Sequence, residues 1–191
     1  MEINKIIEEK IEILNSLKDS EYMILAGKVI NEMVESLNNG GKILLAGNGG
    51  SAADAQHFAG EIVGRFMMER EALPAISLCV DPSVMTCIGN DYGYEKVFSR
   101  QIKGLGNKGD IFVAISTSGN SDNLIDAVIS AREKGLITVG FLGKDGGKLK
   151  EICDYSLVVP SKITPRIQEV HTFTVHIMCE NIEKQIFMNS K

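Results

Sequence analysis

The chain has 191 residues, of which 44% are hydrophobic and 24% are charged, and its formal net charge is -5. This composition is typical of one globular domain, and it excludes a disordered chain, a collagen-like repeat and a small disulfide-stapled scaffold. An acidic chain with a pI near 5.3 shows no basic patch for nucleic acid, so we expect no nucleic-acid partner.

The N-terminal region predicts two helices between residues 2 and 38. Ile3, Ile7 and Ile11 recur at helical spacing, and a second apolar pattern begins at Ser20. The residues at 38–41, Asn-Asn-Gly-Gly, are suited to end it. We therefore predict a helical pair over 1–38, followed by the main domain over 39–191.

The rest of the chain alternates short apolar runs with helical patterns. Such alternation with short connections predicts a parallel sheet covered by helices on both faces, an α/β sandwich. Ligands of such sheets bind beyond the carboxyl ends of the strands. The expected strands are 42–46, 75–80, 110–116, 136–142 and 155–159, and the expected helices are 51–66, 122–134 and 165–187.

The loop after the first strand contains Gly47, Asn48, Gly49, Gly50 and Ser51. With the next residue, alanine, it matches the G-x-G-x-x-G/A pattern of dinucleotide sites. The acid that ends the following strand comes more than 30 residues later, too far for that fingerprint. We therefore favour a loop that holds another ligand through backbone N–H groups and the asparagine.

A second loop, at residues 116–121, joins a predicted strand to a predicted helix. Its hydroxyl groups surround a glycine where a helix begins, which is typical of an anion site. It lacks the G-K-[ST] of a nucleotide P-loop, so a phosphate monoester is the expected ligand. A helix-capping cluster without a ligand is the alternative. The hydroxyl residues are Ser116, Thr117, Ser118 and Ser121.

Candidate metal or acid–base residues lie on two predicted helices. His57 and Glu61 are four residues apart and share one helix face. On the last helix, His176 aligns with a glutamate seven residues before it and lies about 80° from Gln168. Spacing alone does not select the partner of His176. Buried, hydrogen-bonded histidines remain the alternative interpretation.

Seven blocks in chain order resemble the sugar-isomerase (SIS) domain family, and within it the branch that isomerises a seven-carbon sugar phosphate. The resemblance spans nearly the whole chain and implies a flavodoxin-like fold with a five-stranded parallel sheet. The blocks are Gly47–Ser51, Asp54–Phe58 with Glu61, Gly64–Phe66, Gly89–Gly93, Ser116–Ser121, Gly143–Gly147, and Arg166–Glu169 with His176.

The resemblance implies a homotetramer whose N-terminal helices pack between subunits, and one Zn²⁺ per subunit. We expect Glu61 and His176 to be the catalytic acid–base pair, since burial and neighbours can tune a carboxylate and an imidazole towards neutrality. The implied zinc ligands are His57, Glu61, Gln168 and His176. The implied substrate contacts are Asn48, Gly49, Gly50, Asn90, Asp91, Ser116, Thr117, Ser118 and Ser121. By position we expect Ser51 and Arg65 to border the site, and we expect Glu61 and Gln168 to contact the substrate as well.

The implied reaction converts D-sedoheptulose 7-phosphate to D-glycero-D-manno-heptose 7-phosphate through a cis-enediol. It is the first step towards ADP- or GDP-heptose. One departure is Pro165, where some members carry an aspartate.

Two other functions were weighed against this one. A related SIS protein binds the replication initiator without catalysis, but it lacks counterparts of Glu61 and His176. Isomerases of other phosphosugars carry extra domains or a different residue set.

The apolar runs, the N-terminus and the cysteines bear on the location and redox state of the chain. No run approaches the roughly 20 apolar residues of a membrane span, and the N-terminus lacks the features of a signal peptide. The four cysteines form no Cys-x-x-Cys pair. We therefore expect a cytoplasmic chain with reduced thiols and no membrane partner. The cysteines are Cys79, Cys87, Cys153 and Cys179.

Overall fold

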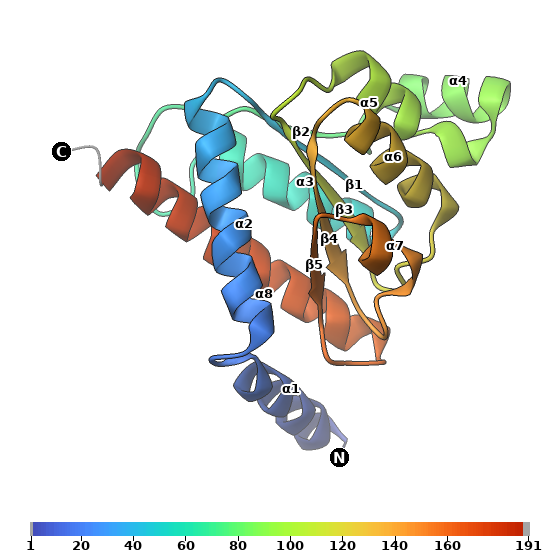
Figure 1. The fold of residues 1–191 in the computed structure, drawn as a ribbon. Coiled ribbons are helices and arrows are strands. Elements are labelled where there is room, and N and C mark those ends of the chain that lie inside the picture. The colour runs from blue at the N-terminus through green and yellow to red at the C-terminus, as the bar shows by residue number, and fades with distance from the viewer. Residues whose placement is uncertain (1, 189–191) are drawn as a thin grey trace.

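The computed structural model describes residues 2–188, and its centre is a five-stranded parallel sheet in the order β2-β1-β3-β4-β5 (Figure 1). This is the flavodoxin-like strand order. The predicted α/β fold is therefore confirmed. The strands are β1 (Ile43–Gly47), β2 (Ala75–Ser77), β3 (Ile111–Ser116), β4 (Ile137–Leu142) and β5 (Tyr155–Val158).

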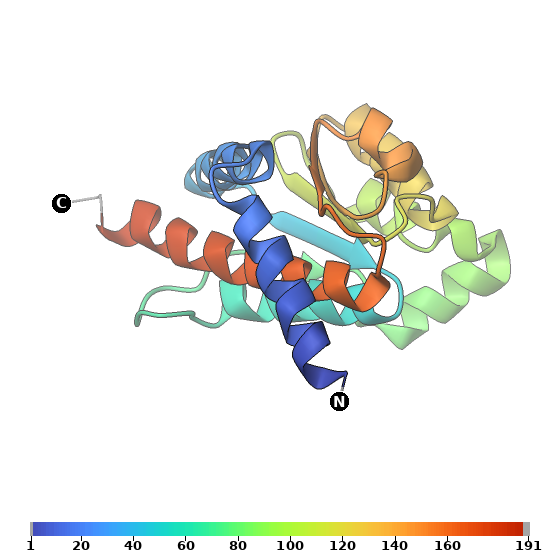
Figure 2. The ribbon, with the colours of Figure 1, turned by 90° about the horizontal axis from the view of Figure 1, so that it is seen from below.

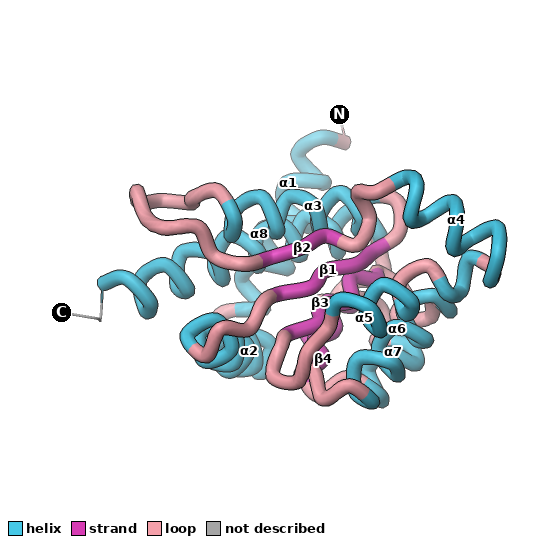
Figure 3. The backbone as a smooth tube through the Cα atoms, turned by 90° about the horizontal axis from the view of Figure 1, so that it is seen from above, coloured by secondary structure: helices cyan, strands magenta, loops and turns pink. Residues whose placement is uncertain are grey.

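Helices cover both faces of the sheet, which lies between them when the molecule is viewed from above (Figure 3). One layer contains α2 (Glu21–Asn38), α3 (Gly50–Val63) and α8 (Thr164–Glu183). The opposite layer contains α4 (Pro82–Tyr92), α5 (Ser99–Leu105), α6 (Asp122–Glu133) and α7 (Gly147–Ile152). A π-helical turn over Lys184–Met188 follows α8.

The strands divide their side chains between two cores because successive residues of a strand point to opposite faces. Ile43 and Leu45 of β1 pack in the core under α2, α3 and α8. Leu44 and Ala46 of the same strand pack in the core under α4 to α7. β1 and β3 are buried along their whole length, as expected for central strands of a parallel sheet.

Helix α1 (Ile3–Leu17) projects beyond these layers (Figures 1 and 2). Leu17 is the only residue of α1 that is buried. Two weak ion pairs connect the helix to the first turns of α8: Lys10 with Glu169 at 3.7 Å and Glu9 with Arg166 at 3.8 Å. By contrast, α2 is part of the main core. The predicted boundary at residues 38/39 remains a prediction.

Three short helices were missing from the sequence prediction: α4, α5 and α7. The segment expected as a strand over 75–80 stays extended only to Ser77. Asp81, interpreted as a strand-end acid, is the N-cap of α4, where its carboxylate accepts the N–H of Val84 at 3.0 Å. No helix within residues 2–188 is long and apolar enough to cross a membrane.

The chain reverses its direction of winding between β1 and β3. β2 lies on one side of β1 and β3 on the other, so the helices after β1 and β3 cover opposite faces. The loops that follow these two strands therefore diverge and leave a crevice at their carboxyl ends, where open α/β sheets bind ligands. Both loops singled out in the sequence begin at this crevice.

Candidate functional site

A cavity of about 120 Å³ lies at the crevice between the two loops. No charged side chain lines it, so hydroxyl and amide groups must provide the hydrogen bonds of any ligand. Its lining residues are Asn48, Ser51, Ile115, Ser116, Thr117, Ser118 and Ser121.

The hydroxyl groups of this cavity are not used to cap the helix that follows. Ser121 is the N-cap of α6 but makes no side-chain capping bond; its Oγ lies 3.3 Å from Ser116 Oγ. Within residues 2–188, the backbone N–H groups of Thr117 and Ser118 have no protein acceptor. Free loop donors next to the N-terminus of α6 favour an anion over a closed structural cap.

Close backbone packing fixes the shape of the hydroxyl loop. Gly119 has φ +66°, and a Cβ there would collide with the carbonyl oxygen of Gly146. Leu149 N–H donates to the Gly119 carbonyl at 2.9 Å, and Ser116 Oγ accepts the Gly119 N–H at 3.1 Å. The loop is therefore held in place before any ligand arrives.

Asn48 is held by two side chains that the sequence analysis did not assign to the site. It exchanges two amide hydrogen bonds of 2.9 Å with Asn123, and Tyr94 Oη donates to Asn48 Oδ1 at 3.1 Å. Asn123 is buried on the inner face of α6 beside Leu124 and Ala127. The sequence signal that could have identified Asn123 was an asparagine among the apolar residues of this helix face.

A second group of predicted site residues meets where α3 packs against α8. His57 Nε2 and His176 Nε2 are 2.9 Å apart, although 119 positions separate these residues in the chain. Glu61 Oε1 lies 3.5 Å from the other ring nitrogen of His57, Nδ1. The structure therefore brings His57, Glu61 and His176 together.

Gln168 lies against the first turn of α3. A Cβ on Gly50 would run into the Gln168 side-chain amide, so the missing side chain lets the two helices approach closely. Glu169, the residue that aligned with His176 by spacing, instead pairs with Arg166 and with Lys10 of α1. In the structure, Gln168 therefore contacts α3, whereas Glu169 contacts α1 and Arg166. Spacing along α8 alone does not distinguish these two positions.

Two imidazoles, a carboxylate and an amide oxygen are donors of the kind that zinc binds. His57 and His176 direct their Nε2 atoms at each other across 2.9 Å, so two of the four donors already lie together. Glu61 contacts Nδ1 of His57, whereas Gln168 lies against Gly50, and no hydrogen bond or ion pair within residues 2–188 joins it to the other three. The donor set fits zinc, and the two histidines already converge.

Three predicted substrate contacts lie outside these two groups. Arg65 forms a surface ion pair with Glu69 at 3.6 Å. Asn90 and Asp91 are exposed at the end of α4 and bond to each other at 2.8 Å. Within residues 2–188, no hydrogen bond joins these three residues to the rest of the predicted site.

Asp54 occupies α3 between Gly50 and His57. Its Oδ1 accepts the Thr172 hydroxyl of α8 at 2.9 Å, while its buried Oδ2 has no partner within the described residues. Burial raises the pKa of this carboxyl group, and the hydrogen bond from Thr172 partly offsets the rise. Asp54 therefore bridges the two helices between the Gln168 contact and the histidine pair.

His171 faces the core rather than the other histidines. Its ring is fully buried against Phe141, and its Nε2 lies 3.0 Å from the Leu142 carbonyl oxygen. Burial lowers its pKa from 6.5 to about 4, although the carbonyl contact favours the charged form. His171 is therefore neutral at neutral pH and donates its Nε2–H to Leu142.

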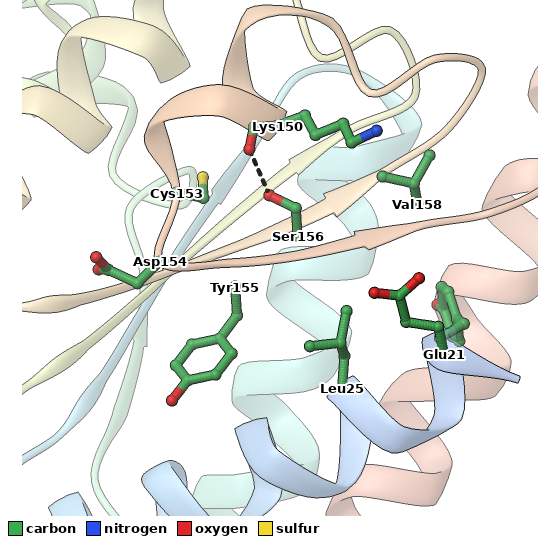
Figure 4. Close-up of a pocket in the computed structure, with 9 residues that line it drawn as sticks. Glu21, Leu25, Lys150, Cys153, Asp154, Tyr155, Ser156 and Val158 are labelled. Atoms are coloured by element: carbon green, nitrogen blue, oxygen red, sulfur yellow. Dashed lines mark hydrogen bonds between the residues drawn. The ribbon is translucent and has the colours of Figure 1, made fainter.

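A larger cavity, of about 340 Å³, lies at edge strand β5, between α2 and α7 (Figure 4). None of the predicted site residues line it. It contains Cys153, but burial raises the pKa of this thiol to about 12, so the thiolate is scarce at neutral pH. We therefore place the functional site at the crevice.

The model of the SIS domain family matches residues 7–143 of the chain. A phosphoheptose isomerase from Aneurinibacillus thermoaerophilus is 54% identical over 173 residues, which is 91% of this chain and 87% of the relative. One from Sulfurimonas denitrificans is 50% identical over 186 residues, or 97% and 95% of the two chains.

A solved structure of phosphoheptose isomerase from Neisseria gonorrhoeae superposes with a TM-score of 0.89 at 42% identity, covering 95% of this chain and 97% of the other. The chain matches these relatives over nearly their full length, both in sequence and in fold. It therefore belongs to the SIS domain family, within the group of phosphoheptose isomerases, and is an aldose–ketose isomerase.

Proposed function

We propose that the chain converts D-sedoheptulose 7-phosphate to D-glycero-D-manno-heptose 7-phosphate. The observation that carries the proposal is the position of two unlike groups on α3. Ser51, in the first turn, lines a hydroxyl cavity suited to a phosphate group. His57 and Glu61, further along the helix, meet His176. One end of a sugar phosphate can bind in the cavity while its carbonyl end reaches the acid–base residues.

The reaction moves the carbonyl from C2 to C1 and a proton from C1 to C2. It needs a base that removes the C1 proton and an acid that protonates the C2 oxygen, which gives a cis-enediol. The proton is then delivered to C2, and the O1 proton is removed. Glu61 and His176 are the proposed acid–base pair, since a carboxylate and an imidazole both exchange protons near neutral pH in such sites.

The phosphate cavity positions the substrate and takes no part in proton transfer. Hydroxyl and backbone N–H donors hold the phosphate at C7, far from the reacting carbons. Binding energy at that remote group then orients C1 and C2 against the acid–base pair.

We propose that zinc is the cofactor, with His57, Glu61, Gln168 and His176 as its ligands. The chemistry of these donors supports the proposal. Lewis-acid polarisation of the carbonyl, which stabilises negative charge on the enediolate, is what zinc supplies when these residues bind it.

We also propose that the enzyme is a homotetramer in the cytoplasm, where it starts the route to a nucleotide-activated heptose. Four free cysteines support a reducing compartment. The stripe of Ile3, Ile6, Ile7 and Ile11 on α1 supports the assembly, because these side chains are 43% to 54% exposed in the single chain. Sedimentation equilibrium is expected to give four times the 20.8 kDa of one chain; the mass of a monomer would contradict the assembly.

The substrate is tested by incubating the purified chain separately with sedoheptulose 7-phosphate, arabinose 5-phosphate and glucosamine 6-phosphate, and following products by NMR. We expect heptose 7-phosphate from the first and no isomerisation of the others. Faster turnover of either other sugar would overturn the proposed substrate. Capture of the replication initiator by a chain inactive on all three would replace isomerisation with a binding function.

A further inference from the structure

The segment between α3 and β2, residues 64–74, lies over the end of α8 and is fixed there by a buried ion pair. Arg70 Nε and Glu183 Oε1 are 2.8 Å apart, and the two side chains are only 1% and 2% exposed. Neither residue belongs to the predicted site. A buried ion pair adds little net stability compared with well-packed apolar residues of similar volume.

Both carboxylate oxygens of Glu183 accept backbone N–H groups of the segment. Glu183 accepts the N–H groups of Phe66 and Met67 at 2.8 Å and that of Met68 at 3.3 Å. Burial alone would raise the pKa of Glu183, but these N–H donors and the Arg70 guanidinium together lower it. The carboxylate therefore stays ionised and holds three consecutive residues.

The contacts of the pair reach both proposed acid–base residues. Arg70 Nη2 donates to the backbone carbonyl oxygen of Glu61 at 2.9 Å, near the end of α3. On the other side, Glu183 fixes Phe66, whose ring centroid is 5.6 Å from that of His176. The His176 ring therefore has two aromatic neighbours, Phe66 and His57, and the His57 centroid is 5.1 Å away.

We propose that Arg70 and Glu183 are positioning residues for the isomerisation: they hold the Phe66 ring on His176 and fix the end of α3 that carries Glu61. Neither touches the reacting atoms. The inference rests on the proposed function, because the pair acts through the proposed acid–base residues. It assigns a role to a segment that joins α3 to β2 without regular secondary structure.

The substitution Phe66→Leu tests this without disturbing the ion pair, since the backbone N–H of residue 66 still binds Glu183. We expect kcat to fall about 10- to 100-fold, because small displacements of catalytic groups are costly, and KM to stay within about twofold. Phe66→Tyr, which keeps the ring, is expected to restore kcat. Phe173→Leu is the matched control, since Phe173 is an exposed aromatic residue of α8, the helix that carries His176.

A second variant, Arg70→Lys, keeps the positive charge but cannot bind Glu183 and the Glu61 carbonyl at once, because only arginine has the planar fork. We expect lower kcat with little change in KM. The imidazole NMR signals of His176, recorded without substrate, should shift in Arg70→Lys and Phe66→Leu but not in Phe173→Leu.

These readouts separate the two proposals. If wild-type protein does not turn over the heptose phosphate, the function fails, yet the NMR signals still report on positioning. Unchanged kcat in Phe66→Leu would overturn the inference, even if Arg70→Lys did not fold.

Discussion

The two halves of the site are built in different ways. The hydroxyl cavity comes from two strand-end loops, is uncharged, and has its shape fixed by backbone hydrogen bonds such as that from Leu149 to Gly119. The histidine–carboxylate cluster comes from side chains of two helices, with His57 and His176 separated by 119 positions. The difference teaches that binding and chemistry can be disturbed separately: changes in the loops should act on KM, and changes at the helix contact on kcat.

The largest effect is expected at the helix contact. Glu61→Gln keeps the shape of the side chain but removes its basicity, so kcat should fall about 10²- to 10⁴-fold, as for lost acid–base groups. His176→Ala should do the same. Steady-state kinetics on sedoheptulose 7-phosphate measure both, with the exposed Glu151→Gln as the control. Near-normal kcat in either variant would remove that residue from the acid–base pair.

His171, the other histidine of α8, faces the core and takes no part in the predicted site. Burial lowers the pKa of His171 from 6.5 to about 4. Because the unfolded chain binds a proton more readily below pH 6.5, the folded state should lose about 3 kcal/mol between pH 6.5 and 4 from this residue. Urea unfolding at both pH values should show a weaker pH dependence in His171→Gln. An equal dependence in both proteins would contradict the buried, neutral assignment.

A smaller effect is expected in the hydroxyl cavity. Ser118→Ala removes one hydroxyl donor to the phosphate, and hydrogen bonds to charged groups contribute about 1.5–3 kcal/mol. KM should therefore rise about 10- to 100-fold while kcat changes little. Ser156→Ala, at the separate cavity of Figure 4, is the control. Unchanged KM in Ser118→Ala would make the loop a structural cap only.

The smallest effect concerns a residue that supports the cavity from behind. Tyr94→Phe removes the hydroxyl that donates to Asn48 Oδ1, while the two amide bonds with Asn123 remain. A neutral hydrogen bond contributes about 0.5–1.5 kcal/mol, so KM should rise about 2- to 10-fold. If the cost falls on kcat instead, Asn48 belongs with the chemistry, and the separation of the two halves is wrong.

The two halves also differed in how far the sequence could predict them. The cavity follows from local pattern: an apolar strand, then glycine and hydroxyl residues, then a helix start. Its position at one edge of the sheet follows from parallel topology alone. For the same reason both helical layers were predictable, whereas the strand order was implied only by the family resemblance. Helices α5 and α7, with seven and six residues, were too short to show a helical period.

The helix contact depends on long-range packing, which spacing within one helix does not contain. Gln168 was selected over Glu169 by resemblance alone, and its contact with Gly50 is visible only in the fold. Arg70 and Glu183 carried no sequence signal either, because their pairing joins a loop to the end of a helix 113 positions away. The Gln168 contact and the Arg70–Glu183 pair both form only through tertiary packing.

The most direct test of the account is turnover of sedoheptulose 7-phosphate before and after a strong chelator, with metal content measured on the same sample. The account predicts heptose 7-phosphate formation that falls as zinc is removed and returns when zinc is restored. Full turnover by metal-free protein would contradict the role of the four zinc ligands, and no turnover by folded, zinc-loaded protein would contradict the proposed reaction itself.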